Sequence, residues 1–135
     1  MDHNKVLKPL RTLLVEPDSS ARKYLTSSLR KRGHTVRVCP DGEMAWRAHE
    51  KKPYDLVIVD WQLPDMDSLV FVQKIRSLSA DRVTVVIAIA AKEKPGDLEL
   101  LLAAGIDDFV SVPLYPPLMD IRLAIAERQI RSRAE

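Results

Sequence analysis

The sequence has one cysteine, few glycines and no long apolar run. A lone Cys39 among 135 residues excludes an internal disulfide and a cysteine-based metal cluster, and it fits a reducing compartment. The four glycines form no G-x-G-x-x-G or G-x-x-x-x-G-K pattern, which argues against a nucleotide-binding loop. No apolar run approaches the ~18 residues of a membrane span, and the N-terminus lacks the apolar stretch of a secretory signal. We therefore expect a cytoplasmic protein with no membrane contact.

The charges are also too balanced to indicate a nucleic-acid surface. Lys and Arg number 21 against 19 Asp and Glu, which leaves a formal net charge of +2. Direct binding to nucleic acid relies on many uncompensated phosphate contacts, so we expect none here. Hydrophobic residues make up 46% and charged residues 30%, as in ordinary globular proteins, and the length fits a single domain.

Five short apolar segments alternate with five amphipathic ones along the chain. The segments DLVIVD (55–60) and VTVVIAIA (83–90) are almost continuously apolar, which is typical of parallel strands covered on both faces. Strands are expected at 11–15, 35–39, 55–60, 83–90 and 108–112, each followed by a helix. This alternation predicts an α/β fold of the flavodoxin-like, doubly wound type: a five-stranded parallel sheet in the order 2-1-3-4-5, flanked by five helices.

Acidic side chains follow the two strands between which the order of such a sheet reverses. Glu16 and Asp18 follow the first strand, and Asp60 ends the third. Ligands of doubly wound sheets bind at this switch point. Three carboxylates that converge there would repel one another and favour a bound cation, and oxygen ligands suit Mg²⁺. In the alternative interpretation, Asp18 only caps the next helix and Asp60 only ends a strand.

Three blocks of the sequence resemble the receiver domain of two-component response regulators: LLVEPD (13–18), DLVIVDWQLPDMDSL (55–69) and LAAGIDDFVSVPL (102–114). The resemblance runs from about Arg11 to Arg128. It implies a receiver domain at 11–128, an N-terminal extension at 1–10, and a helical tail or the start of a linker at 129–135. It also implies phosphorelay signalling rather than an enzyme, with a histidine kinase or a phosphotransfer protein as partner.

The resemblance assigns roles to individual residues. Asp60 lies at the phosphoacceptor position, where the carboxylate attacks the phosphorus of a phospho-histidine donor. Mg²⁺ ligands would come from Glu16, from Asp60 itself and from the backbone carbonyl of Gln62. Phe109 lies at the position of an aromatic switch that responds to phosphorylation.

The chain departs from the family pattern at three positions. Pro17 replaces a second acidic metal ligand, Ala90 a hydroxyl residue, and Val112 a lysine. Asp18 is the candidate to replace the missing ligand, with capping of the next helix as the favoured alternative, so we expect weak Mg²⁺ binding. The candidate phosphoryl contacts after the fourth strand are Ala90, Ala91 and Lys92, the last of which could also be a solvated lysine. These losses leave an alternative function open: a degenerate receiver that acts as a phosphorylation-independent interaction module.

The last helix carries two apolar stripes. We expect the stripe of Leu118, Ile121 and Ile125 to pack on the sheet. The second stripe, spaced 4-3-4 as in coiled coils, is predicted to pair with a second copy of the chain in a homodimer. It consists of Met119, Leu123, Ala126 and Ile130. The alternative is a frayed tail with incidental apolar residues.

Two smaller expectations concern histidine and proline. The three histidines, His3, His34 and His49, show no metal-ligand spacing and are expected at the surface. The Val112–Pro113 bond is expected to be cis, because the resembled Lys-Pro bond is cis.

Overall fold

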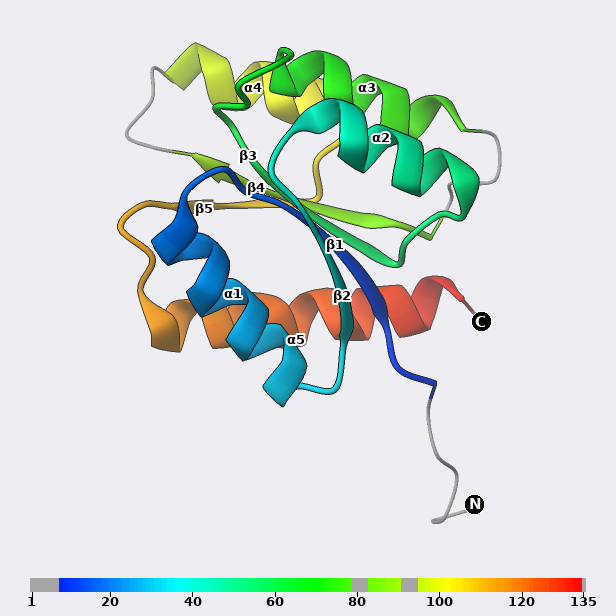
Figure 1. Ribbon diagram of the computed structural model, residues 1–135, viewed down its shortest axis with the longest axis vertical. Coiled ribbons are helices and arrows are strands. Elements are labelled where there is room, and N and C mark those ends of the chain that lie inside the picture. The colour runs from blue at the N-terminus through cyan, green and yellow to red at the C-terminus, as the bar shows by residue number, and fades with distance from the viewer. Residues whose placement is uncertain (1–7, 79–82, 91–94, 135) are drawn as a thin grey trace.

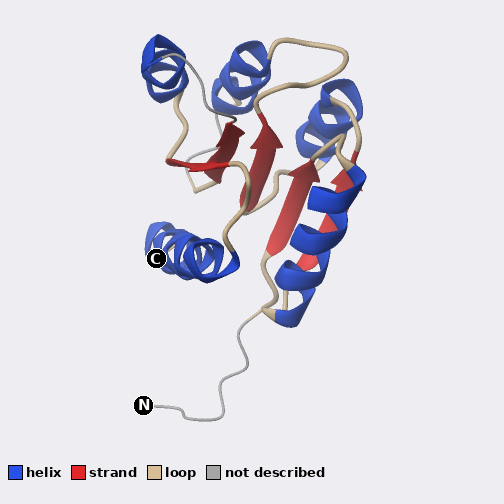
Figure 2. Cartoon of the chain, turned by 90° about the vertical axis from the view of Figure 1, so that its left-hand side faces the viewer, coloured by secondary structure: helices blue, strands red, loops and turns tan. Residues whose placement is uncertain are grey.

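A single parallel sheet forms the centre of the molecule (Figures 1 and 2). The computed structural model describes residues 8–78, 83–90 and 95–134. Its strands lie in the order β2-β1-β3-β4-β5, which confirms the predicted fold. The strands are β1 (Arg11–Val15), β2 (Thr35–Cys39), β3 (Leu56–Asp60), β4 (Val85–Ala90) and β5 (Asp108–Ser111). The helices are α1 (Ser19–Lys31), α2 (Gly42–Lys51), α3 (Ser68–Ser77), α4 (Pro95–Ala104) and α5 (Pro116–Arg133).

The helices form one layer on each face of the sheet. Figure 1 shows α1 and α5 on one face and α2, α3 and α4 on the other. Alternate side chains of the central strands serve the two layers: Leu56 and Ile58 belong to the core beneath α1 and α5, and Val57 and Val59 to the opposite core. All four are fully buried, which is why this strand is apolar at consecutive positions rather than alternating.

Aspartates begin the first three helices, and glycines end two. The side chains of Asp18, Asp41 and Asp67 each accept a hydrogen bond from a backbone N–H in the first turn of α1, α2 and α3. Gly33 and Gly105, with φ of 87° and 114°, follow α1 and α4 and turn the chain back toward the sheet. These aspartates and glycines are local features of the sequence, and they mark where the helices begin and end.

The last helix packs with a different face from the one predicted. The four residues expected to pair with a second chain lie in the core: Met119, Leu123, Ala126 and Ile130. Each is at most 2% exposed, whereas Leu118 and Ile121, expected on the sheet, are 44% and 56% exposed. The predicted seam between chains is therefore wrong, because its side chains are used within the domain. This stripe runs from Met119 to Ile130, so it packs against the core along most of α5.

Ion pairs fix this orientation of α5. Glu127 accepts hydrogen bonds from Arg32 Nε and Nη2 at 2.8 and 2.7 Å, in the turn after α1. At the end of the helix, Arg133 Nη2 lies 2.6 Å from Asp107 Oδ1. Both pairs form only when the Met119 stripe faces the sheet, and α5 therefore remains attached to the domain up to Arg133.

His34 joins the same network and corrects the expectation that it lies at the surface. Its Nδ1 lies 2.7 Å from Thr12 Oγ1 and its Nε2 lies 2.7 Å from Glu127 Oε2. Burial opposes ionisation of Glu127, but the hydrogen bonds from Arg32 and His34 outweigh it and hold the pKa of Glu127 below its usual value. His49 is also buried, and its Nδ1 accepts a hydrogen bond from Tyr54 N at 3.1 Å. His3 lies outside the described residues.

Two further predictions can be compared with the structure. The Val112–Pro113 bond is cis, as expected. Within the described residues, no helix has the length and apolar character needed to cross a membrane.

The packing of α5 predicts opposite results for two neighbouring substitutions. Leu123→Ala should lower the free energy of unfolding by about 2–5 kcal/mol, because it leaves a cavity in the core. Ile121→Ala, on the exposed face, should change it by less than about 0.5 kcal/mol. Urea unfolding followed by circular dichroism measures both values. Equal losses for the two variants would contradict the orientation of α5.

Candidate functional site

Two acidic side chains meet at the carboxyl ends of β1 and β3. Val15 pairs with Val59 in parallel register, so Glu16 and Asp60 occupy the next position on each strand. Glu16 is 1% exposed, and Asp60 is half-buried. The order of the sheet reverses between these strands, so the pair lies where a doubly wound sheet binds its ligands.

The environment of Glu16 favours its protonated form. Burial, a hydrogen bond with Asp60 and the charge of Asp60 together raise the pKa of Glu16 from 4.5 to about 8. The backbone N–H of Asp18 donates to Glu16 Oε2 at 3.3 Å and offsets only part of this effect. The pair therefore holds a proton at neutral pH unless a cation takes the place of that proton.

The loop after β3 holds Asp60 in place. Gln62 N donates to Asp60 Oδ1 at 2.8 Å, which orients the carboxylate. The hydroxyl of Ser68, at the start of α3, donates to the backbone carbonyl of Asp60 at 2.9 Å and also contacts that of Trp61. The backbone N–H of Trp61 donates to Ile89 O at 2.7 Å and continues the pairing with β4. Hydrogen bonds thus fix both the side chain and the backbone carbonyl of Asp60.

Asp18 does not join the acidic pair. Its Oδ2 accepts from Ala21 N at 2.8 Å and caps α1, and its side chain is exposed. Within the part of the chain that the structure describes, no three His, Cys, Asp or Glu side chains gather to hold a metal ion. The capping alternative for Asp18 is therefore confirmed, and its role as a metal ligand stays a prediction. Glu16, Asp60 and the carbonyl of Gln62 remain as the candidate ligands.

Two described residues at the ends of β4 and β5, Ala90 and Val112, are apolar. Ala90 ends β4 and is 2% exposed, and Val112 follows β5, with its N–H bonded to Ala90 O at 3.2 Å. Neither side chain can donate a hydrogen bond or carry a positive charge. The candidate phosphoryl contacts Ala91 and Lys92 lie outside the described residues.

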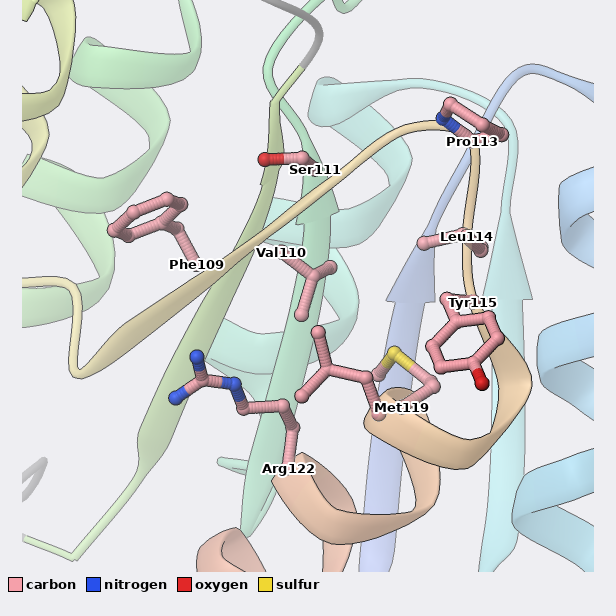
Figure 3. A pocket seen from close by; sticks show the side chains of 9 residues that line it. Phe109, Val110, Ser111, Pro113, Leu114, Tyr115, Met119 and Arg122 are labelled. Carbon is pink, nitrogen blue, oxygen red and sulfur yellow. The ribbon is translucent and has the colours of Figure 1, made fainter.

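Phe109 lies on β5, where it pairs with Ala88 of β4. Its ring is half-buried against the core beneath α2, α3 and α4, whereas Val110 points to the opposite face, toward Met119 (Figure 3). A hollow of about 210 Å³ between β5 and the start of α5 is lined in part by Phe109, Tyr115 and Arg122. The structure thus places the proposed switch residue where it contacts both the core and an open surface.

Comparison with known proteins agrees with this geometry. The family described as "Response regulator receiver domain" matches residues 12–123. The chain belongs to this receiver family. Among curated proteins, it is 31% identical over 132 residues to the transcriptional activator protein PfeR of Pseudomonas aeruginosa, covering 97% of the chain and 42% of PfeR. It is 32% identical over 121 residues to the two-component response regulator ORR41 of Oryza sativa subsp. japonica, covering 87% of the chain and 94% of ORR41.

Solved structures extend the comparison. The receiver domain of the sensor histidine kinase PA1611 from Pseudomonas aeruginosa superposes with a TM-score of 0.78 at 29% identity, over 91% of this chain and 98% of that one. That structure holds a magnesium ion coordinated in its active-site cleft. The chain spans about half of the length of PfeR and of the regulatory protein RprY of Bacteroides fragilis, 42% and 52%. The chain is thus a receiver module of two-component phosphorelay signalling.

Three residues that shape the site of this receiver domain were not found from the sequence. The hydroxyl of Ser68 bonds to two backbone carbonyls of the loop between β3 and α3, here called the acceptor loop because it follows the predicted phosphoacceptor Asp60. Arg22 Nη1 donates to the carbonyls of Glu16 and Pro17 at 3.2 and 3.3 Å and supports the loop after β1. The carboxylate of Asp65, in the acceptor loop, accepts hydrogen bonds from the first two backbone N–H groups of α2. Arginine and serine on a helix give no sequence signal for such contacts, because their partners are backbone atoms.

The raised pKa of Glu16 predicts how stability depends on pH without divalent cations. The folded domain binds this proton up to about pH 8, whereas an unfolded glutamate releases it near 4.5. The unfolded state therefore holds fewer protons in this range, and the free energy of unfolding should fall as pH rises from about 4.5 to about 8.

Urea unfolding at a series of pH values tests this, with Glu16→Gln as the comparison. The variant carries no titrating group at this position, so it should lose less stability than the wild-type chain over the same range. Parallel pH profiles for the two proteins would contradict the raised pKa.

Proposed function

We propose that Asp60 accepts a phosphoryl group from a phospho-histidine of a histidine kinase or phosphotransfer protein. The observation that carries the proposal is the arrangement of Asp60: a half-buried carboxylate at the switch point, beside the buried Glu16, with Oδ1 held by Gln62 N at 2.8 Å. A positioned carboxylate of limited exposure is suited to act as a nucleophile. On this proposal the domain is a signalling module whose state is read by other proteins, not an enzyme with a substrate of its own.

The transfer exchanges one bond for another. A carboxylate oxygen of Asp60 forms a bond to phosphorus as the P–N bond of the donor breaks, and the electron pair of that bond stays on the imidazole. Because Oδ1 of Asp60 already accepts a hydrogen bond from Gln62 N, we assign the attack on phosphorus to Oδ2. The product is an acyl phosphate, with its added charge next to Glu16.

The residues present fit Mg²⁺, although with few ligands. The carboxylates of Glu16 and Asp60 and the carbonyl of Gln62 are hard oxygen donors, and Mg²⁺ is commonly held by one or two carboxylates together with water. When bound, Mg²⁺ supplies positive charge that neutralises the phosphoryl oxygens. The magnesium ion described for the PA1611 receiver domain supports this assignment.

The apolar side chains of Ala90 and Val112 lower the expected rate of phosphoryl transfer to Asp60. Removal of one positioned donor from a transition-state site costs on the order of 3 kcal/mol, and about 1.4 kcal/mol corresponds to a tenfold change in rate. With Ala90 and Val112 in place of a hydroxyl and a lysine, we expect transfer roughly a hundredfold or more slower than in a receiver that has both groups. Slow transfer still permits signalling when the donor is bound and oriented.

Acetyl phosphate with Mg²⁺ tests the proposal without the unknown kinase. Intact-mass measurement of the full chain should show the gain of one phosphoryl group, lost on treatment with hydroxylamine, which cleaves acyl phosphates. Asp60→Asn should show no gain, because its amide is not a nucleophile. Asp67→Asn, in the same loop, should be modified like the wild-type chain. Absence of the added mass at saturating acetyl phosphate and Mg²⁺ would contradict the proposal.

A further inference from the structure

The carboxylate of Asp65 connects the acceptor loop to the start of α2. Its Oδ1 accepts from Gly42 N at 2.8 Å and its Oδ2 accepts from Glu43 N, also at 2.8 Å. These are two of the N–H groups that the first turn of a helix leaves without partners, and negative charge is favourable at this end. One side chain of the loop after β3 therefore holds the N-terminus of a helix that begins 23 residues earlier in the sequence.

The contact between the loop after β3 and the start of α2 is closely packed as well as charged. Gly42 is buried, and a Cβ atom added to it would lie 2.7 Å from Cγ of Met66 and 3.1 Å from Cδ1 of Leu63. Two side chains of the loop thus occupy the space that any larger residue at position 42 would need. The loop therefore packs directly against the start of α2.

This connection fixes the part of the loop that carries Gln62. The loop leaves β3 at Asp60 and enters α3 at Ser68, whose hydroxyl anchors its far end. Between these points, Asp65 supplies the bonds to α2, so that Gln62 lies in a segment held on both sides. The geometry points to Asp65 as a positioning residue, which holds the Gln62 carbonyl in place for the cation beside Asp60. This inference rests on the proposed function of Asp60 as phosphoacceptor.

Asp41 provides a matched control at the same helix terminus. Its Oδ1 accepts from Met44 N at 2.9 Å and caps α2 from the residue directly before the helix. Asp41→Ala and Asp65→Ala both remove a carboxylate from the start of α2, but only Asp65→Ala releases the acceptor loop. A purely structural role of Asp65 would give the two variants the same properties.

Two measurements on the full chain separate these roles. Hydrogen exchange, followed by mass spectrometry of the peptide over residues 61–67, should become roughly tenfold faster in Asp65→Ala, because two charge-assisted bonds are lost. Exchange in this peptide should not change in Asp41→Ala. The Mg²⁺ concentration that half-quenches Trp61 fluorescence should rise about tenfold in Asp65→Ala only, as is usual when a residue that orients a metal ligand is removed. Trp46→Phe in every chain leaves Trp61 as the single tryptophan.

The outcomes distinguish the inference from the function on which it rests. Faster exchange and weaker Mg²⁺ binding in Asp65→Ala alone support the positioning role. Equal behaviour of the two variants in the exchange experiment overturns it. If the wild-type chain neither binds Mg²⁺ nor accepts a phosphoryl group, the proposed function of Asp60 fails, and exchange alone decides whether Asp65 holds the loop. If Asp65→Ala does not fold, Asp65→Asn replaces it, since the amide keeps one acceptor and should give an intermediate exchange rate.

Discussion

Glu16 and Asp60 end neighbouring parallel strands, so the register that pairs Val15 with Val59 also brings two acidic side chains together. Glu16 is buried, and burial beside the carboxylate of Asp60 favours either a proton on Glu16 or a cation between the two side chains. The fold therefore creates a position that attracts positive charge. The chemistry proposed for Asp60, including the fit to Mg²⁺ and the orientation by Gln62, depends on this constraint.

The two sides of the site differ in the polar groups that could contact a phosphoryl group. On the acidic side, the loops after β1 and β3 are held by side chains that bond to backbone atoms: Arg22 for the first, Ser68 and Asp65 for the second. On the side of β4 and β5, Ala90 and Val112 offer only apolar contact. The loops that carry Glu16 and Asp60 are thus held by hydrogen bonds, whereas Ala90 and Val112 carry no group that could stabilise added negative charge.

The sequence predicted the features that follow from local pattern. Continuous apolar strands give a parallel sheet, and the sheet order alone places Asp60 at the switch point. The orientation of α5 could not be predicted, because Ile121 and Leu123 belong to stripes of similar hydrophobicity, and ion pairs with distant segments help to fix the one that packs. The burial of His34 depends on a partner 93 residues away, and the role of Asp65 depends on the neighbouring helix. Contacts between segments far apart in sequence, rather than local preferences, account for these differences.

The central claim is that Glu16 and Asp60 share a proton which a divalent cation displaces. Titration of the domain with Mg²⁺ by calorimetry, at pH 7 in buffers of different ionisation enthalpy, measures the protons released on binding. The account predicts release of most of one proton per bound ion, tighter binding as pH rises toward 8, and neither effect in Glu16→Gln. Binding of Mg²⁺ without proton release, with an affinity that does not change between pH 6 and pH 9, would contradict it.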